Sequence, residues 1–347
     1  MKAVVYHGRD DLRLEDVPIP EPGPGEMLVR VDACGICPTD LKKIEKGLLP
    51  GPRIFGHEIA GTVAMLGTGT RGFREGQRVV VHHHVPCRRC FYCARRAFAQ
   101  CPRYKENGTT AGFAPAGGGY AEYVRARDWI VDEGTVKVPD GVSAEEAAFV
   151  EPVNTCLKAV EKAAVGAGES VLVVGQGPIG LLLLQLARWR GARALVTDPL
   201  AERRELGCRL GAEAGLDSGD DVAERVRAVT DGRGVDCALV AAGGRAALAQ
   251  ALAATRPGGR VLSFAATSPG EIAEIDLGAL TTAEKDVLTS YSSSIELQDK
   301  AASLVFERTV RVRELISDRL PMERALEAFA LARRPGPGTL KVVLARG

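Results

Sequence analysis

The pattern of hydrophobic and polar residues changes near residue 168. Before it, from residue 2 to about 150, Gly and Pro break the chain into short β-rich pieces. In one of these pieces Met27, Val29 and Val31 occupy alternate positions, the period of a strand with one buried face. The prolines within residues 18–25 exclude a helix there and predict an extended connection. This half of the sequence therefore predicts an irregular antiparallel β domain.

After residue 168, apolar strands alternate with helical patterns. An apolar run at 171–174 leads into a glycine turn, a helical run through residue 190 and a second strand at 194–197. Further strand candidates, 236–240 and 260–264, flank a helical pattern at 245–254. This order predicts a doubly wound parallel sheet, so the fold class is α/β. An amphipathic stretch at 323–334 and a strand at 341–344 follow, and periodicity does not say where they dock.

Length and charge narrow the class of protein. A chain of 347 residues suggests about two domains. With 45 Lys and Arg against 44 Asp and Glu, nothing in the net charge of +1 favours a nucleic acid or an acidic membrane as partner. Residues 1–16 lack the apolar stretch of a signal peptide, and the longest apolar run, 179–184, is too short to span a bilayer. We expect a globular cytoplasmic protein.

The nine cysteines are better explained in such a chain as metal ligands or buried thiols than as disulfides. Four of them, Cys87, Cys90, Cys93 and Cys101, follow the spacing C-x2-C-x2-C-x7-C. One short loop can then wrap four thiolates around a tetrahedral zinc ion, and a closed four-sulfur shell predicts a structural role. An iron–sulfur cluster and four free thiols remain as alternatives. Four further cysteines have no ligand spacing among them and are predicted to be small buried hydrophobes: Cys34, Cys156, Cys208 and Cys237.

A second group of metal-binding residue types precedes that loop. Cys37 lies in a Cys-Gly-Ile-Cys-Pro-Thr-Asp segment, and His57 and Glu58 follow about twenty residues later. Glu151 begins the Glu-Pro step at which the β half gives way to the βαβ half. Each feature alone has another explanation, a redox pair for the two cysteines and a surface pair for His-Glu. Together they predict an open zinc site.

The predicted chemistry of this second site is alcohol oxidation. A thiolate and a carboxylate offset the charge of Zn²⁺ and leave a position for an alcohol oxygen, whose pKa the metal lowers. Charge gathered on that oxygen helps to expel a hydride from the carbon towards a nicotinamide. Thr39, two residues after Cys37, is the predicted acceptor of the hydroxyl proton.

A dinucleotide-binding loop follows the first strand of the βαβ half. It has the pattern GxGxxG with a strand before it and a helical run after it, which is the context that gives this motif its meaning. The predicted roles are a tight turn at the first glycine, close approach of the pyrophosphate at the second, and helix–strand packing at the third. The cofactor-binding residues of this loop are Gly175, Gly177, Pro178, Ile179 and Gly180.

Asp198 ends the second strand of the βαβ half. A carboxylate there can bind both hydroxyls of the adenosine ribose and would repel a 2′-phosphate, so the sequence favours NAD over NADP. Arg203 and Arg204 lie close to it in sequence. They are explained either as solvated helix residues or, for Arg203, by stacking on the adenine.

The order of these motifs resembles the zinc-containing medium-chain dehydrogenase/reductase family, and within it the sorbitol or L-iditol 2-dehydrogenase-like branch. The resemblance covers essentially the whole chain. It implies a GroES-like catalytic domain over residues 1–150, completed by about 292–347, and a Rossmann domain over 151–291. It also implies two zinc ions per chain and a homodimer or homotetramer.

Carried over by position, the resemblance makes Cys37, His57 and Glu58 ligands of a catalytic zinc, with Glu151 as the exchangeable fourth ligand or the holder of a zinc-bound water. Thr39 resembles the hydroxyl member of a proton relay, and Asp198 with Arg203 resembles an adenosine clamp. Many relatives place a histidine five residues after the cysteine to end that relay, whereas this chain has Lys42. A lysine could relay only with a depressed pKa.

The resulting hypothesis is a zinc- and NAD-dependent dehydrogenase that oxidises a secondary alcohol of a polyol, cyclitol or sugar-derived substrate to a ketone. An L-threonine 3-dehydrogenase and a biosynthetic cyclitol dehydrogenase are rivals within the same class. A non-catalytic nucleotide-binding protein is the rival from another class, and it predicts one zinc per chain instead of two.

Overall fold

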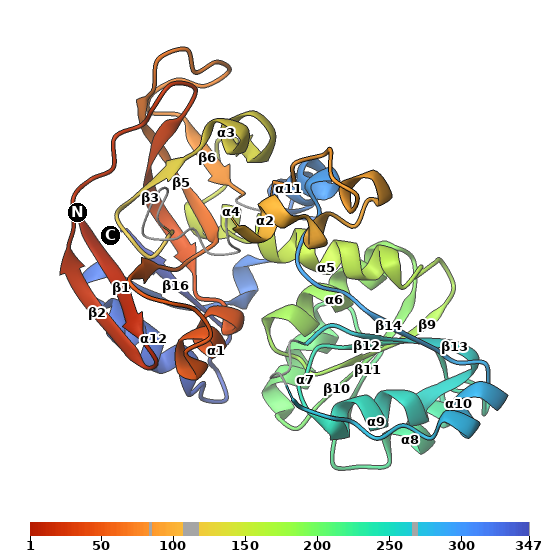
Figure 1. Cartoon of the computed structure of the whole chain (residues 1–347). Helices are drawn as coiled ribbons and strands as arrows, with labels where there is room; N and C mark the ends of the chain where they lie inside the picture. Colours follow the sequence, from red (N-terminus) through yellow and green to blue (C-terminus); the bar gives the residue numbers. More distant parts are fainter. Residues whose placement is uncertain (83–84, 107–117, 266–269, 347) are drawn as a thin grey trace. The chain divides into compact units, whose positions relative to one another are not determined.

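A computed structural model describes residues 1–82, 85–106, 118–265 and 270–346 of the chain (Figure 1). Three consecutive histidines, His82, His83 and His84, are predicted to be structural or solvent-facing, because adjacent residues of a strand point to opposite faces and make a poor chelate. Of these, His83 and His84 lie outside the described residues. The chain divides into two compact units, which we call unit 1 (1–154 and 293–347) and unit 2 (155–292). The boundaries at 150/151 and 291/292 stay predictions, because contacts within one chain do not show which segments fold alone.

Unit 1 is built on two sheets of its described residues. A small antiparallel sheet has the order β2-β1-β4, with β1 at Lys2–Gly8, β2 at Asp11–Asp16 and β4 at Arg53–Ile54. The larger sheet has the order β15-β16-β3-β5-β6-β8, and β7 also pairs with β3. Its strands are β3 (Met27–Gly35), β5 (Glu58–Leu66), β6 (Arg78–Val81), β7 (Tyr123–Ala126), β8 (Thr135–Lys137), β15 (Ile316–Leu320) and β16 (Lys341–Ala345).

The larger sheet joins distant parts of the sequence. β16, near the end of the chain, pairs antiparallel with β3 and parallel with β15. The helices of unit 1 are α1 (Pro38–Lys46), α2 (Pro102–Glu106), α3 (Asp128–Gly134), α4 (Ala144–Ala147), α11 (Gln298–Phe306) and α12 (Ala325–Arg333). Short 3-10 turns occupy η1 (Cys93–Arg95), η2 (Phe98–Gln100), η3 (Ile295–Leu297), η4 (Arg313–Leu315) and η5 (Met322–Arg324). Helix α5 (Val150–Lys162) carries the chain from unit 1 into unit 2.

Unit 2 is a doubly wound parallel sheet, as predicted. Its described strands have the order β11-β10-β9-β12-β13-β14, and every neighbouring pair is parallel. The strands are β9 (Ser170–Val174), β10 (Arg193–Asp198), β11 (Ala214–Asp217), β12 (Val235–Val240), β13 (Thr255–Ser263) and β14 (Asp286–Thr289). In chain order this is 3-2-1-4-5-6, the arrangement of dinucleotide-binding domains, and the order reverses beside β9.

Helices cover both faces of this sheet, which explains why its central strands are apolar throughout. Helix α6 packs against β9, β10 and β12, whereas α8 and α9 pack on each other on the opposite face (Figure 1). The helices are α6 (Pro178–Trp189), α7 (Ala201–Arg209), α8 (Val222–Ala228), α9 (Arg245–Ala254) and α10 (Leu277–Thr282). The core around α8 and α9 includes Leu172, Val226, Ala238 and Ala251.

The predicted elements of unit 2 match closely, and the misses have structural reasons. Strand β13 begins five residues before the predicted 260, because Thr255 already pairs with Val235 ahead of a bulge. In β3 the alternation fails at Leu28, which is buried although Arg30 and Asp32 on the same face of the strand are partly exposed. The prediction for Cys208 was wrong, since it is exposed on α7.

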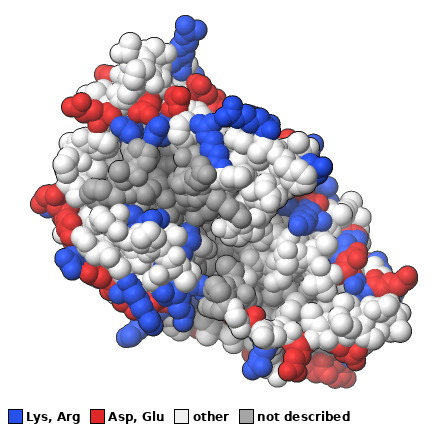
Figure 2. Space-filling model, viewed as in Figure 1, with Lys and Arg blue, Asp and Glu red and all other residues white. Residues whose placement is uncertain are grey.

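The surface agrees with a balanced composition. Lys and Arg are interspersed with Asp and Glu over the face in view (Figure 2). No helix among the described residues is long and apolar enough to cross a membrane.

Candidate active site

Cys37, His57 and Glu58 form a group of candidate metal ligands, which we call the metal cluster. Two segments, or arms, supply these residues, and the first arm is the turn from β3 into α1. Cys37 is the residue before the helix, in an extended conformation, and Pro38 occupies the first turn, where its missing N–H costs no hydrogen bond. Asp40 follows in the same turn and is completely buried. The sequence around Cys37 therefore places a thiol and a carboxylate on one short rigid segment.

The second arm is the start of β5. His57 precedes this strand and Glu58 begins it, and both are buried. Strand β5 pairs with β3 so that Glu58 lies opposite Gly35, which brings this arm beside Cys37. The candidate ligand atoms of Cys37, His57 and Glu58 all lie within 4.8 Å of one another.

Asp40 orients the histidine. Its Oδ2 lies 3.1 Å from Nδ1 of His57. This contact favours the tautomer with the proton on Nδ1, which leaves the lone pair for a metal on Nε2. Burial by itself lowers the pKa of His57, but the charges of Asp40 and Cys37 outweigh it and hold the pKa well above its ordinary value. The histidine thus lies in a strongly negative environment.

Glu58 has a partner of its own. The Nζ of Lys341, on β16, lies 2.7 Å from each carboxylate oxygen, and both side chains are 3% exposed. Burial by itself lowers the pKa of Lys341, but the Glu58 carboxylate outweighs it and raises the pKa above its ordinary value. Glu58 is therefore both a member of the cluster and one half of a buried ion pair.

This donor set fits a zinc ion. A thiolate, an imidazole with its lone pair fixed, and a carboxylate are the ligand types of zinc sites. Asp40 adds a further buried negative charge behind the histidine. A dication would balance this charge, whereas thiolate and carboxylates buried together without one would repel each other.

Three further residues were predicted for this site: Glu151, Thr39 and Lys42. Glu151 is buried at the start of α5, near enough to Lys341 to act on its charge, but it is not part of the cluster of candidate ligand atoms. Thr39 and Lys42 lie on α1, both partly buried and three residues apart. The ligand role of Glu151 and the relay roles of Thr39 and Lys42 stay predictions.

The four cysteines of the predicted structural site converge. The sulfur atoms of Cys87, Cys90, Cys93 and Cys101 lie within 4.8 Å of one another. Burial and the neighbouring thiols raise the pKa of Cys93, whereas the backbone N–H of Arg89 lowers that of Cys87. Four thiolates cannot coexist there without a cation, so this loop fits a tetrahedral metal ion.

The glycine loop of unit 2 has the expected geometry. Gly175 has φ of +90°, and a side chain at Gly180 would collide with the carbonyl oxygen of Gly175. Gly177 differs, because a Cβ there would meet no atom of the chain within 4 Å. Pro178 and Ile179 then begin α6. The open space at Gly177, before the helix N-terminus, fits a pyrophosphate group.

Asp198 ends β10 beside this loop. Its two carboxylate oxygens accept hydrogen bonds from the backbone N–H of Gln176 at 2.7 Å and of Leu200 at 2.9 Å. Arg203 is partly buried on α7. The carboxylate of Asp198 is thus fixed in one orientation at the end of the strand. The guanidinium of Arg204 contacts the backbone carbonyl of Asp198 and the carboxylate of Asp217.

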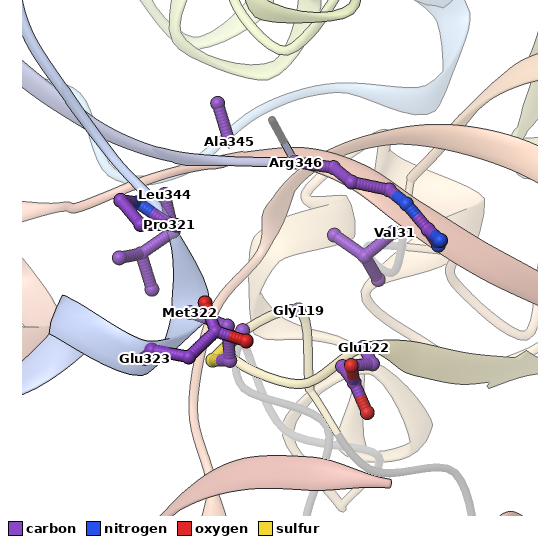
Figure 3. A pocket seen from close by; sticks show the side chains of 9 residues that line it. All are labelled: Val31, Gly119, Glu122, Pro321, Met322, Glu323, Leu344, Ala345 and Arg346. Atoms are coloured by element: carbon purple, nitrogen blue, oxygen red, sulfur yellow. The ribbon is translucent and has the colours of Figure 1, made fainter.

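A pocket of about 200 Å³ lies elsewhere in unit 1, and none of the clustered metal ligands lines it. Figure 3 shows Met322 and Glu323 from the C-terminal segment, Glu122, and Arg346 around it. Glu122 accepts a hydrogen bond from the backbone N–H of Lys2. No cysteine or histidine is among its described lining residues, so this pocket does not share the donor set of the metal cluster.

Sequence reasoning missed three residues that support the cluster. Asp40 carried a signal, because it lies three residues after Cys37 in a helix and its side chain belongs to the same turn. Lys341 carried a weaker one, as a charged residue at the head of an apolar strand. Tyr120, whose hydroxyl contacts Asp40, carried none.

The comparisons agree with this architecture. Residues 23–140 match the family described as "Alcohol dehydrogenase GroES-like domain", and residues 178–307 match "Zinc-binding dehydrogenase". A sorbitol dehydrogenase of Bacillus subtilis (strain 168) is 30% identical over 99% of this chain and 97% of its own length. An L-threonine 3-dehydrogenase of Pyrococcus abyssi is 35% identical over 75% of this chain and 73% of its own length.

A solved structure of a zinc-binding dehydrogenase from Sinorhizobium meliloti 1021, bound to NADP, superposes with a TM-score of 0.90. It is 30% identical and the match covers 99% of each chain. The fold and these matches define an oxidoreductase of the zinc-binding, two-domain type, with a GroES-like and a Rossmann domain. The chain belongs to the zinc-containing medium-chain dehydrogenase family, and within it resembles the sorbitol dehydrogenase-like branch.

Proposed function

We propose that this protein oxidises a secondary alcohol of a polyol, cyclitol or sugar-derived substrate to a ketone, with zinc at Cys37, His57 and Glu58 and with NAD as the hydride acceptor. The observation that carries the proposal is the convergence of these three ligand groups within 4.8 Å, in a chain that also has the glycine loop. Glu151 is proposed as the exchangeable fourth ligand, and a second zinc is proposed at the four cysteines.

The residues of unit 1 would each have a separate task. When bound, zinc supplies a Lewis acid that lowers the pKa of the alcohol hydroxyl. Cys37 and His57 hold the ion, and Asp40 keeps Nε2 of His57 directed at it through the contact with Nδ1. Lys341 holds the Glu58 carboxylate by two contacts of 2.7 Å, which favours Glu151 as the ligand that exchanges with substrate.

The proton and the hydride leave the substrate by different routes. The hydroxyl of Thr39 would accept the proton from the alcohol while donating its own proton to Lys42, one turn further along α1. Lys42, in its unprotonated form, would accept that proton and pass it to solvent in place of the histidine of many relatives. The electron pair of the C–H bond leaves with its hydrogen as hydride and reduces the nicotinamide, while the carbon becomes a carbonyl.

Asp198 supports NAD as the cofactor. Its carboxylate is held by two backbone N–H groups, and such a group accepts hydrogen bonds from ribose hydroxyls but repels a 2′-phosphate. A similar solved protein is bound to NADP, so the choice between NAD and NADP is tested by activity measurements with both. Arg203 is proposed to stack on the adenine.

L-threonine is the rival substrate, favoured by the 35% identity to a threonine 3-dehydrogenase. A panel of polyols, cyclitols and L-threonine, each followed by NADH absorbance and repeated with NADP, separates these candidates. Turnover of L-threonine alone would replace the polyol assignment and leave the zinc chemistry in place.

The central experiment replaces Cys37 with Ser and counts zinc. We expect two zinc ions in the native chain and one in the variant. The variant should lose about a thousandfold in kcat/KM, the equivalent of several kcal/mol of Lewis-acid stabilisation, yet bind NADH normally. Cys208→Ser, at an exposed cysteine outside both clusters, is the matched control and should keep both ions and full activity.

A native chain with one zinc would favour the non-catalytic alternative, and full activity of Cys37→Ser would contradict the zinc mechanism outright.

The proposed assembly is a homodimer or homotetramer in the cytoplasm. Among the described strands, β14 lies at one edge of its sheet. Val287 on β14 has an exposed apolar side chain, as do Ile272 and Leu277, which lie nearby in sequence. Exposed apolar residues at a sheet edge are typical of contact surfaces. Light scattering on the purified chain measures the assembly.

A further inference from the structure

Tyr120 is a buried tyrosine that connects the two arms of the metal cluster. It is 1% exposed, and its ring packs edge-on against Phe329 of α12 with centroids 5.0 Å apart. Its backbone N–H donates to the carbonyl of Phe55, and the N–H of Gly119 donates to the carbonyl of Gly56. The backbone of this segment is therefore attached directly ahead of His57.

The hydroxyl of Tyr120 reaches the other arm. It accepts a hydrogen bond from the backbone N–H of Cys37 at 3.2 Å. Its own hydrogen can be donated to the carbonyl of Gly35 at 3.3 Å or to Oδ2 of Asp40 at 3.1 Å. Hydrogen bonds to a charged acceptor are the stronger ones, so the carboxylate is the favoured acceptor.

The same oxygen of Asp40 contacts His57. Oδ2 lies 3.1 Å from Nδ1 of the imidazole and 3.1 Å from the hydroxyl of Tyr120. A continuous path of contacts thus runs from the N–H of Cys37 through the Tyr120 hydroxyl and the Asp40 carboxylate to the ring of His57. All of its side chains except that of Cys37 are fully or almost fully buried, so water does not compete for them.

We propose that Tyr120 is a positioning residue of the metal centre, whose hydroxyl fixes the Cys37 arm relative to the His57 ring through Asp40. The inference rests on the proposed zinc function, because it concerns how the ligands of that ion are held. Tyr120 supplies no ligand itself. Partners that orient ligands in this way typically contribute about 10- to 100-fold to metal affinity.

The test is Tyr120→Phe, which removes only the hydroxyl, compared with Tyr6→Phe. Tyr6 is a matched control in the same unit, since it is 1% exposed, packs edge-on against Phe55 at 5.2 Å and donates to the carbonyl of Leu49. The affinity of the full-length protein for zinc is measured by competition with a chromophoric chelator. The absorption spectrum of the cobalt-substituted protein reports the geometry at Cys37.

We expect Tyr120→Phe to weaken the zinc site of Cys37 and His57 by about tenfold or more and to shift the cobalt–thiolate band. Zinc at the four cysteines should be unaffected. Tyr6→Phe should lower the melting temperature by a similar amount but bind metal as the native protein does. Equal metal affinities and spectra for the two variants would overturn the inference.

A double-mutant cycle with Asp40→Asn tests the route. If the hydroxyl acts through Asp40, the loss in zinc affinity caused by Tyr120→Phe is much smaller in the Asp40→Asn background than alone. Additive losses would overturn the proposed path. The zinc content of the native protein distinguishes this failure from failure of the proposed function. One zinc per native chain would mean that Cys37 and His57 hold no metal, and this result would contradict the proposed function itself.

Discussion

Lys341 is a buried lysine, and the burial of its charged ammonium group would cost much free energy without its partner Glu58. Its side chain is 3% exposed, and the two contacts of 2.7 Å with Glu58 compensate for the loss of hydration. The strand that carries it is otherwise apolar. A lysine at this position is tolerated because a carboxylate from β5 meets it inside the protein.

We predict that Lys341→Met destabilises the zinc-free chain by about 3 kcal/mol, because it leaves the Glu58 carboxylate buried and unpaired. Calorimetric unfolding of the metal-free proteins measures the loss. The double variant Lys341→Met with Glu58→Gln should regain most of it, since no isolated charge then remains. A single variant as stable as the native chain would contradict the ion pair.

At the scale of elements, the carboxylate of Asp236 connects three neighbouring strands. Asp236 lies on β12, accepts hydrogen bonds from the N–H and hydroxyl of Ser170 on β9, and pairs with Arg256 on β13. Partial burial by itself raises the pKa of Asp236, but these donors outweigh it and lower the pKa to about 2 from 3.8. The ionised form is therefore the one that stabilises the sheet.

We predict that Asp236→Asn lowers stability at pH 7 by about 1 kcal/mol, a modest value because the side chain is partly exposed. A lowered pKa in the folded state gives stability that is fully present above pH 3.8 and is lost as the pH falls through about 2. The gap between variant and native melting temperatures should therefore narrow below pH 3.8.

The control for this prediction is Asp231→Asn. Asp231 also pairs with an arginine, Arg233 at 3.0 Å, but its side chain is 85% exposed. An exposed pair contributes little, so this variant should melt close to the native protein at every pH. Equal losses for both substitutions would show that the position of Asp236 between strands is unimportant.

At the scale of the whole molecule, the two units hold their chemistry separately. Both metal clusters belong to unit 1, and the glycine loop with Asp198 belongs to unit 2. Each unit also has a hydrophobic core of its own. Loss of the metals should therefore leave the dinucleotide site formed.

We predict that stripping zinc with a chelator abolishes alcohol oxidation but changes the dissociation constant for NADH by less than about threefold. Fluorescence titration of NADH measures the binding. Asp198→Ala is the reciprocal control and should keep both zinc ions while weakening NADH by about tenfold or more, the value of lost charge-assisted hydrogen bonds. Loss of NADH binding together with zinc would contradict this separation.

The sequence by itself determined the features that depend on short segments. The apolar runs and glycine turn around residues 170–200 predict strands, loop and helix closely, because parallel strands buried on both faces have an unmistakable composition. The four cysteines of the metal lobe lie within fifteen residues, so their spacing alone predicts that the sulfur atoms meet. Cys37, His57 and Glu58 were also predicted as one group from their residue types and their positions in the sequence, and the resemblance then implied their role as ligands of one zinc ion.

Only the tertiary structure decided the partners that lie far apart in the chain. Lys341 meets Glu58 across 283 residues, and Tyr120 meets Cys37 across 83, because β16 and the segment before β7 both reach β3 in the folded sheet. Periodicity records which face of an element is buried, but it carries no information about which other element covers that face. The grouping of Cys37, His57 and Glu58 could therefore be predicted from the sequence, whereas their contacts with Lys341 and Tyr120 could not.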